Sequence, residues 1–306
     1  MKKNSFYIKF LGFILFFLLL YNIGWDKTLE SLKKVSFSYL LGALPVFWIA
    51  FYLKSLRWKI ISNSYGISLS SYQAFKVFFI GLFLANITPG KIGDFARLFY
   101  IKENLPNKKV GLASLIMDRL FDLVCLLFFS LIAIIYYQVY FNLLKPPDTY
   151  ESILFWGFVF VGFILGYYFL RNKLKRILMP WLSAFNSHNL KGDKVVLGII
   201  LTFFSMILIY GIFNYVAWGM GISIDHLGLF LGVFILGVLS LLPITILGIG
   251  VRETSLVVIF NLYGLASEDA IALSLIIFVL QLISLIPGAI FFYLSPVEIS
   301  QLKKIK

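Results

Sequence analysis

Residues 86–97 read Asn-Ile-Thr-Pro-Gly-Lys-Ile-Gly-Asp-Phe-Ala-Arg and interrupt a long apolar run. The interruption combines a proline and two glycines with three ionisable side chains, Lys91, Asp94 and Arg97. Freed backbone groups and charges are tolerated at membrane depth only where protein buries them or where they line a wet cavity. A second interruption, residues 243–253, reads Pro-Ile-Thr-Ile-Leu-Gly-Ile-Gly-Val-Arg-Glu. The two interruptions predict one site that is built from two halves.

The composition is that of an integral membrane protein. The chain has 306 residues, of which 60% are hydrophobic and only 13% are charged, whereas charged residues make up about a quarter of a soluble domain. The apolar runs are long enough for helices that cross a bilayer, and no stretch alternates in the blocks of roughly ten residues typical of an outer-membrane barrel. The sequence therefore predicts an all-α polytopic membrane protein.

The net charge of +13 is explained by the membrane. The lysines and arginines lie between apolar runs, where they orient the helices and contact anionic head groups. No separate basic domain is present that would bind nucleic acid. We therefore expect the bilayer as a partner and no nucleic acid. The single cysteine, Cys125, rules out an internal disulfide.

Six apolar runs predict full transmembrane spans. They cover residues 6–23, 37–56, 111–137, 152–170, 195–220 and 270–294. The charged stretch 26–36 has apolar residues at helical spacing and predicts an amphipathic helix at the interface. Two further runs, about 72–104 and about 227–263, are interrupted, and the two ends of each fall on one side of the membrane. Both are expected to be re-entrant helical hairpins.

The order span, span, hairpin, span occurs twice. We expect a first membrane half over residues 1–140 and a second over residues 141–306. Each half contains three full spans, an odd number, so the second half is inserted upside down as an inverted-topology repeat. The basic segment 171–194 is expected in the cytoplasm, which puts both termini inside a cell membrane. The segment 27–34 carries three lysines and falls outside in this orientation, which counts against it.

The candidate site residues come from three places. Helix-start N–H groups and basic side chains at both interruptions favour phosphate or carboxylate. Asp94 is expected to pair with Arg97 or to carry a coupling proton. Between the interruptions, Asp118 and Asp122 share one helix face. The full set of candidate substrate-binding residues is Asn86, Thr88, Gly90, Lys91, Gly93, Asp94, Arg97, Asp118, Arg119, Asp122, Gly248, Gly250, Arg252 and Glu253.

The same residues also have a purely structural interpretation. The interruptions would then be tight turns with interfacial ion pairs, and the charges at 118–122 would snorkel to the membrane surface. His188 and His226 have no cluster of cysteines or carboxylates around them, so no metal site is expected. No nucleophile with a base and no nucleotide-binding fingerprint occurs. We expect no catalytic residue, no cofactor and no enzymatic activity.

Three motifs resemble the signatures of a known family. Residues 88–97 (TPGKIGDFAR), 117–122 (MDRLFD) and 248–253 (GIGVRE) are similar to those of the lysylphosphatidylglycerol synthase transmembrane family, also called flippase-like or UPF0104 proteins. The family often has Glu where this chain has Asp94 and Asp118, so the charge is kept and the side-chain reach differs. The resemblance covers nearly the whole chain in order and spacing.

The resemblance implies a role in lipid transport. Fused members of the family carry a soluble aminoacyl-transferase domain and move aminoacylated phospholipid across the bilayer. This chain ends at Lys306, so a stand-alone membrane domain without the transferase is expected. Stand-alone relatives are associated with glycolipid, polyprenyl-linked glycan or hopanoid pathways.

The residues and the resemblance together predict a lipid translocase. Such a flippase-like carrier would move an anionic phospholipid, glycolipid or polyprenyl-phosphate-linked lipid across the cytoplasmic membrane. Lys91, Arg97 and Arg252 would hold the phosphate. Asp94 and Glu253 would balance charge or carry protons, and the charges at 118–122 would form a gate or relay.

Two other functions stay open at this point. The chain could be a non-transporting accessory or scaffold subunit of a membrane lipid or glycan assembly pathway, with structural charges. It could also be a membrane-embedded transferase or hydrolase that uses Asp94 and Glu253 as acid and base. A second copy of the chain and a pathway enzyme are both open as protein partners.

Overall fold

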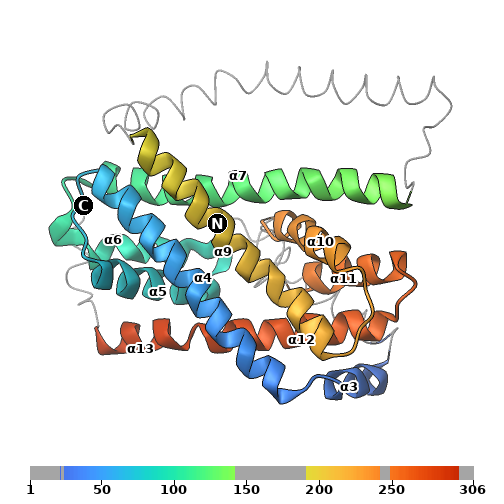
Figure 1. Ribbon diagram of the computed structural model, residues 1–306. Helices are drawn as coiled ribbons and strands as arrows, with labels where there is room; N and C mark the ends of the chain where they lie inside the picture. Colours follow the sequence, from blue (N-terminus) through green and yellow to red (C-terminus); the bar gives the residue numbers. More distant parts are fainter. Residues whose placement is uncertain (1–20, 22–23, 142–190, 242–248, 296–306) are drawn as a thin grey trace, which may run out of the picture.

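The structure is a computed structural model that describes residues 21, 24–141, 191–241 and 249–295. Within these ranges all regular secondary structure is helical (Figure 1). The expected spans 6–23 and 152–170 lie outside the described residues, apart from Tyr21. Residues 243–248 of the second interruption lie outside them too.

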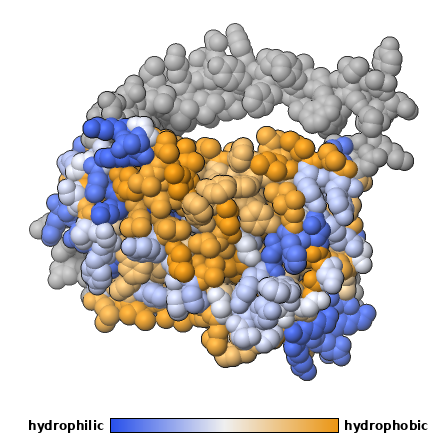
Figure 2. Space-filling view, viewed as in Figure 1, coloured by the Kyte–Doolittle hydropathy of each residue, from blue (hydrophilic) through white to orange (hydrophobic). Residues whose placement is uncertain are grey.

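Four described segments are long and apolar enough to cross a membrane. They are α4 (Phe37–Ser64), α7 (Lys108–Phe141), α9 (Gly192–Gly219), and α12 (Ser267–Ser284) together with α13 (Ile286–Leu294). Figure 2 shows apolar residues over the middle of one face and hydrophilic residues gathered toward its two ends. This distribution is the one expected of helices whose middle sections face hydrocarbon.

Helix α4 is longer than the apolar run predicted. The expected span ended near Leu56, with Lys54, Arg57 and Lys59 as a basic flank, but the helix continues to Ser64. The three basic residues therefore lie within the helix, and Arg57 is completely buried. A hydropathy pattern ends at the first cluster of charges, whereas lysine and arginine are themselves good helix formers.

The last span is interrupted at Leu285, where the sequence predicted one continuous run over 270–294. α12 ends at Ser284, and α13 begins at Ile286 with Pro287 in its first turn. Proline lacks an N–H and breaks the helical hydrogen-bond ladder, which is a common cause of a kink. Trp48 Nε1 donates to the carbonyl oxygen of Ser284 at 3.2 Å, so a neighbouring helix satisfies one acceptor at the interruption.

Two shorter apolar helices precede the interruptions. α5 (Ser71–Ile87) has 17 residues and α10 (His226–Leu239) has 14. At 1.5 Å per residue they are roughly 25 and 20 Å long, less than the hydrocarbon core of about 30 Å. Figure 1 shows α5 at one end of the molecule and α10 toward the opposite end.

The chain after each of these helices differs between the two interruptions. After α5 come the 3-10 helix η1 (Pro89–Ala96), the single turn α6 (Arg97–Tyr100) and the 3-10 turn η2 (Lys102–Asn104). The expectation that the hairpin over about 72–104 continues as one helix after the first interruption, from 90 to 104, is therefore wrong. After α10 the chain resumes as α11 (Val251–Leu262), a regular helix.

The core forms around α4, which packs against α5, α7, α9 and α12. Trp58 and Ile61 of α4 are buried in one apolar cluster with Phe79 of α5 and with Ile212 and Val216 of α9. α10 packs on α7 and α9, and α13 packs on α5. The interruptions are thereby held against the long helices.

A short amphipathic helix lies at the end of the molecule where α12 begins. α3 (Trp25–Lys33) packs on α12, and Lys34 Nζ lies 2.5 Å from Asp269 Oδ1. The lysine-rich segment that counted against the expected orientation therefore lies beside the acidic start of α12. Its positive charge is partly balanced there.

The contact between α5 and α13 depends on Gly288. A Cβ atom at this position would lie 2.2 Å from the carbonyl oxygen of Phe79. Overpacking of this kind costs about 1–3 kcal/mol, so we expect Gly288→Ala to lower the unfolding free energy by that amount in detergent. The matched control is Gly211→Ala in α9, where a Cβ atom meets nothing within 4 Å. Equal unfolding curves for the two variants would contradict this account of the contact.

Candidate functional site

Seven ionisable side chains meet in one network, which we call the charge cluster. Its members are Lys54 and Arg57 of α4, Asp94 of η1, Arg97 of α6, and Asp118, Arg119 and Asp122 of α7. Five of the seven were predicted as candidate residues. The structure brings those five together from segments more than twenty residues apart.

Arg57 lies at the centre of the charge cluster, and its side chain has no exposed surface. Its Nε donates to Asp118 Oδ1 at 2.8 Å, and its Nη1 donates to Asp122 Oδ1 at 2.6 Å. Nη1 also donates to Thr202 Oγ1 of α9 at 2.8 Å. Lys54 Nζ donates to the same Asp122 oxygen at 3.0 Å. One guanidinium group therefore joins α4, α7 and α9.

Arg97 ties the first interruption to α7. Its Nη1 donates to Asp118 Oδ2 at 3.2 Å. Its Nη2 lies 2.6 Å from Asp94 Oδ1. This contact is an ion pair, but its angle lies outside the range of a hydrogen bond. The guanidinium also lies over the rings of Phe78 and Trp58, with centroids 4.3 and 5.2 Å away. Arg97 is thus enclosed by the protein, and among the described residues its Nε and Nη2 have no hydrogen-bond partner.

Two glycines allow this packing. A Cβ atom at Gly81 of α5 would lie 2.5 Å from Arg97 Nε, and one at Gly93 would lie 2.1 Å from the carbonyl oxygen of Leu84. The N–H of Gly93 donates to Thr88 Oγ1 at 2.7 Å. The expectation of a free N–H group for phosphate at Gly93 is therefore wrong, because a side chain of the same interruption already occupies it.

Arg119 is the most exposed member of the charge cluster. Its Nε donates to Asp94 Oδ2 at 2.9 Å, and its Nη1 lies 3.9 Å from Asp122 Oδ2. Its side chain is nevertheless 41% exposed, far more than that of any other member. An anion that approaches the charge cluster meets this guanidinium first.

The charge cluster does not balance its own charge. With every member ionised it contains four cations and three carboxylates, so one positive charge is in excess. Among the described residues, no other carboxylate forms an ion pair with these cations. Buried charges require partners because an unpaired ion loses its hydration. The arrangement therefore favours a bound anion.

The second interruption forms a smaller, neutral group. Arg252 Nε donates to Ser274 Oγ of α12 at 2.8 Å, Ser274 Oγ donates to Glu253 Oε1 at 2.6 Å, and the Arg252 Nη2 lies 3.5 Å from Glu253 Oε1. Gly250 has a φ of 86°, which favours glycine, and its N–H donates to Glu253 Oε2 at 2.5 Å. The start of α11 is therefore capped by its own glutamate, and this N–H is not free for phosphate.

The two interruptions form two groups and not one continuous network. Within the described ranges, no hydrogen bond or ion pair joins the charge cluster to Arg252 or Glu253. They share a neighbour in α12, where Gln281 Nε2 donates to Asn86 Oδ1 at 3.4 Å. Gln281 follows Ser274 by seven residues, or about 10 Å along the helix.

Three candidate residues have no described side chain. Gly90 and Lys91 belong to the backbone of η1, and the side chain of Lys91 lies outside the described part. Gly248 lies outside the described residues as well.

Sequence reasoning missed four residues of these groups: Lys54, Arg57, Thr202 and Ser274. One signal was available for the first two, because they are three apart and share a helix face. Nothing in the sequence marks the two hydroxyl residues, since serine and threonine are common in membrane helices and bond to their own backbone.

The central arginine should be essential for stability. Replacing Arg57 with Met leaves buried carboxylates short of a partner, and breaking a buried pair costs about 3–5 kcal/mol. We expect Arg57→Met to lower the unfolding free energy in detergent by that amount, and Arg57→Met with Asp118→Asn to lose less than the two single variants added together.

Arg119→Gln is the control for this prediction. An exposed ion pair is worth about 0–1 kcal/mol, so this variant should unfold close to the wild type. Wild-type stability of Arg57→Met would mean that the network contributes nothing to the fold.

Comparison with known proteins identifies relatives in archaea. A UPF0104 membrane protein of Methanocaldococcus jannaschii is 24% identical over 302 residues, which is 87% of each chain. A second one from that organism is 25% identical over 235 residues, 70% of this chain and 94% of its own length. One from Pyrococcus horikoshii is 27% identical over 140 residues, 44% of this chain and only 41% of that protein. No solved structure gives a significant match.

The family assignment covers nearly the whole chain. The lysylphosphatidylglycerol synthase TM region matches residues 7–288, which include the charge cluster and the second interruption. The curated relatives carry a name that states membrane location and no activity. This chain, which is similar to archaeal UPF0104 membrane proteins, is a membrane protein of the lysylphosphatidylglycerol synthase TM region family.

Proposed function

We propose that this protein is a lipid translocase, a flippase-like carrier that moves an anionic phospholipid, glycolipid or polyprenyl-phosphate-linked lipid across the cytoplasmic membrane. The observation that carries the proposal is the excess positive charge of the charge cluster. Ionised groups inside membrane helices are costly, and they mark substrate or ion pathways. A phosphate head group supplies the missing negative charge.

The position of the charge cluster along the helices supports this function. Asp118 follows the start of α7 by ten residues, and Thr202 follows the start of α9 by the same number. Ten residues correspond to about 15 Å. Each helix begins with charged residues that belong outside the hydrocarbon, so the charge cluster lies roughly 10 Å inside a hydrocarbon core of about 30 Å. Charges at this depth serve a substrate within the bilayer better than they anchor a helix at its surface.

The proposal includes the architecture of such a carrier. Residues 1–140 and 141–306 form two halves of an inverted repeat, with six full spans and two re-entrant hairpins. The helix contacts support a two-fold relation between the halves, in which α4 corresponds to α9 and the two helices pack on each other. The contact of α4 with α7 is matched by that of α9 with α12, and the contact of α4 with α5 is matched by that of α9 with α10. The contact of α13 with α5 likewise matches that of late α7 with α10. Inverted repeats allow alternating access by exchange of the two halves' conformations.

The two halves differ in charge, which assigns the anion site to the first half. Arg97 donates to Asp118, 21 residues further on, and Arg252 donates to Ser274, 22 residues further on. A hydroxyl group thus stands in the second half where the first has a carboxylate. The second group is neutral by itself, so the excess positive charge belongs to the charge cluster alone.

The geometry favours new roles for the arginines. Arg97 and Arg252 were expected to hold the phosphate, but their exposures of 0% and 4% leave them no free surface. In this proposal they position Asp94, Asp118 and Glu253. Arg119 contacts the phosphate, and it must share its guanidinium between the phosphate and Asp94.

The orientation belongs to the same proposal. Both termini lie in the cytoplasm, and the first hairpin opens toward that side. The anionic lipid is the partner, with no second protein required for transport.

Translocation tests the role of Arg119. Purified protein is placed in vesicles that contain a fluorescent phosphatidylglycerol, and transfer between leaflets is followed by dithionite quenching. Arg119→Gln should slow transfer about tenfold or more, because a charge-assisted hydrogen bond contributes about 1.5–3 kcal/mol. Its unfolding temperature should stay at the wild-type value.

The matched control is Lys109→Gln, which removes an exposed cation from the start of the same helix. It should transfer lipid at the wild-type rate. A wild-type chain that moves no phosphatidylglycerol would point to the accessory role with structural charges. An Arg119→Gln variant as fast as an active wild type would show that Arg119 does not hold the phosphate.

A further inference from the structure

We infer that Lys54 carries a proton that is bound and released together with the anionic lipid. This inference rests on the proposed function and deepens it, because it names a second species that the carrier would move. Lys54 lies in α4, three residues before Arg57, and its Nζ donates to Asp122 Oδ1 at 3.0 Å. The charge cluster then has two neutral states, one empty and one that holds both the proton and the lipid.

Lys54 is the member of the charge cluster whose charge can change. Arginine keeps its proton in proteins, whereas lysine can lose its proton away from bulk water. Each of the three carboxylates accepts a hydrogen bond from at least one arginine of the charge cluster. Asp94, the residue expected to carry a coupling proton, pairs with both Arg97 and Arg119. A proton on any of these carboxylates would remove an acceptor from a buried arginine, but a neutral Lys54 removes none.

The ion pairs of Asp122 do not depend on the proton of Lys54. Asp122 Oδ1 also accepts from Arg57 Nη1 at 2.6 Å, and Asp122 Oδ2 lies 3.9 Å from Arg119 Nη1. Two cations thus meet at one carboxylate oxygen, where like charges repel each other. A neutral amine at Lys54 still has N–H groups that can donate to Asp122. Loss of the proton therefore relieves a repulsion and leaves both arginine contacts in place.

The charge balance couples the proton to the lipid. With Lys54 neutral, three arginines face three carboxylates and the sum is zero. With Lys54 protonated, the cluster has one positive charge, which a phosphate with one negative charge cancels. A net charge enclosed away from water is costly. The carrier therefore closes when it holds both species or neither, because a proton alone or a lipid anion alone leaves one charge unbalanced.

The proton follows the lipid through the cycle. Nζ of the neutral amine accepts a proton from water on the side where the lipid enters, and Lys54 becomes an ammonium group. On the other side the proton returns to water as the lipid leaves. One proton and one monovalent lipid anion cross together, so the cycle moves no net charge.

Asp122 connects the proton site to the phosphate site. The side chain of Lys54 is 12% exposed, whereas those of Arg57 and Arg97 have no exposed surface. Water can therefore reach the amine but not the two buried arginines. Asp122 contacts Lys54 through one oxygen and faces Arg119, which meets the phosphate, with the other. A charge that arrives at either cation is felt by the other through this carboxylate.

The helices packed around α4 bring no further counter-ion. α4 packs on α5, α7, α9 and α12. After Lys194, α9 has no charged residue, and α12 has none after Asp269. Lys76 is the one charged residue of α5, and among the described residues it forms no ion pair. The charge of Lys54 is therefore balanced within the charge cluster or by a ligand.

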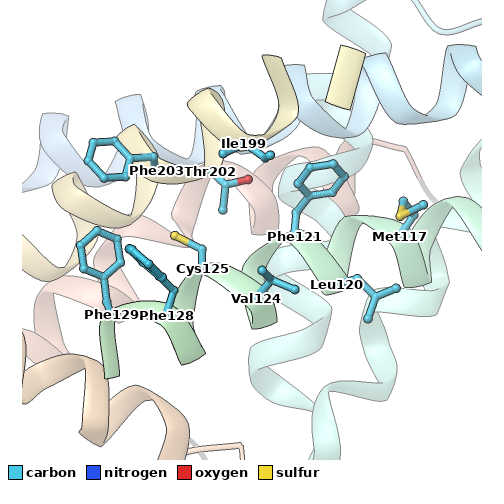
Figure 3. A pocket seen from close by; sticks show the side chains of 10 residues that line it. All are labelled: Met117, Leu120, Phe121, Val124, Cys125, Phe128, Phe129, Ile199, Thr202 and Phe203. Carbon is cyan, nitrogen blue, oxygen red and sulfur yellow. The ribbon is translucent and has the colours of Figure 1, made fainter. Parts of the chain in front are cut away.

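The side of the charge cluster toward α9 is uncharged as well. The cavity between α7 and α9 has a volume of about 400 Å³, and none of its lining side chains carries a charge. Figure 3 shows Thr202 of α9 opposite Phe121 and Cys125 of α7 in this lining. Thr202 contributes a neutral hydroxyl to Arg57. The Cys125 thiol and the Tyr210 phenol, which lie within electrostatic reach of Asp122, are neutral while protonated.

Proton uptake on binding tests the inference. The full chain in detergent, with a pH indicator and little buffer, is titrated with a short-chain phosphatidylglycerol across roughly pH 6 to 9. Binding should take up about one proton per lipid where Lys54 of the empty protein is neutral. The dissociation constant should there rise about tenfold per pH unit, because a lipid that binds with one proton is linked to pH in this way.

Lys54→Arg identifies the group that takes up the proton. The variant keeps the cation but cannot release it, so it should bind the lipid without proton uptake and with a dissociation constant that does not change with pH. The matched control is Lys59→Arg, because this lysine lies on the same helix and donates to Ser71 Oγ at 2.9 Å. It should take up protons as the wild type does, and so should Cys125→Ser. Uptake that persists in Lys54→Arg, or that disappears in Cys125→Ser, overturns the inference.

A pH gradient tests the coupling during transfer. Vesicles with a trace of fluorescent phosphatidylglycerol are given a gradient of about one pH unit, and the leaflet distribution is read by dithionite quenching. The wild type should enrich the lipid about tenfold in the leaflet on the alkaline side, since one proton moves with each lipid. A membrane potential should have no effect on this distribution. Lys54→Arg should lose the response to the pH gradient.

The binding and transfer measurements separate this inference from the proposed function. Proton uptake at Lys54 by a chain that transfers no lipid would keep the proton site and remove the translocase. Transfer that depends on Arg119 but ignores the pH gradient, together with binding that takes up no proton, would keep the translocase and overturn this inference. A wild-type chain that binds no phosphatidylglycerol would overturn both.

Discussion

The structure depends on a carboxylate held between two arginines. Asp118 accepts from Arg57 of α4 through one oxygen and from Arg97 of α6 through the other. All three side chains are buried. Ions in a low-dielectric interior interact strongly, but they lose their hydration, so such a group is stable only when every member is present. The first interruption therefore has one way to dock against the long helices.

That constraint explains the unusual local structure of the first interruption. The chain between α5 and α7 is made of 3-10 turns and one α-turn, which satisfy fewer backbone groups than a regular helix does. The Thr88 hydroxyl donates to the Leu84 carbonyl oxygen and accepts from the Gly93 N–H, so it satisfies two of these backbone groups. The ion pairs of Arg97 with Asp94 and Asp118 hold the segment against α7. An irregular backbone is tolerated in a membrane protein when neighbouring protein satisfies it. The second interruption resumes as a regular helix and needs only its own glutamate and one serine.

The difference between the two interruptions has a functional meaning in the proposed carrier. Two groups of equal charge would repel an anion or attract it equally, whereas here one half is neutral and the other has one positive charge in excess. The most exposed member of the group with the excess charge is Arg119. A lipid phosphate carries the negative charge that the charge cluster lacks.

The sequence by itself determined the class of the protein, the long apolar helices and the two interruptions. Apolar runs of spanning length, prolines and glycines follow from local chemistry, so α7, α9 and the ends of α5 and α10 were predictable, as were five members of the charge cluster. Only the tertiary structure decided which polar and charged side chains pair with one another. Arg57 lies 61 residues from Asp118 and 145 from Thr202, and helical periodicity gives the face of a residue but not the partner across the interface. The sequence also could not show that Arg97 is buried and Arg119 exposed, because the exposure of a side chain is set by the helices that pack around it.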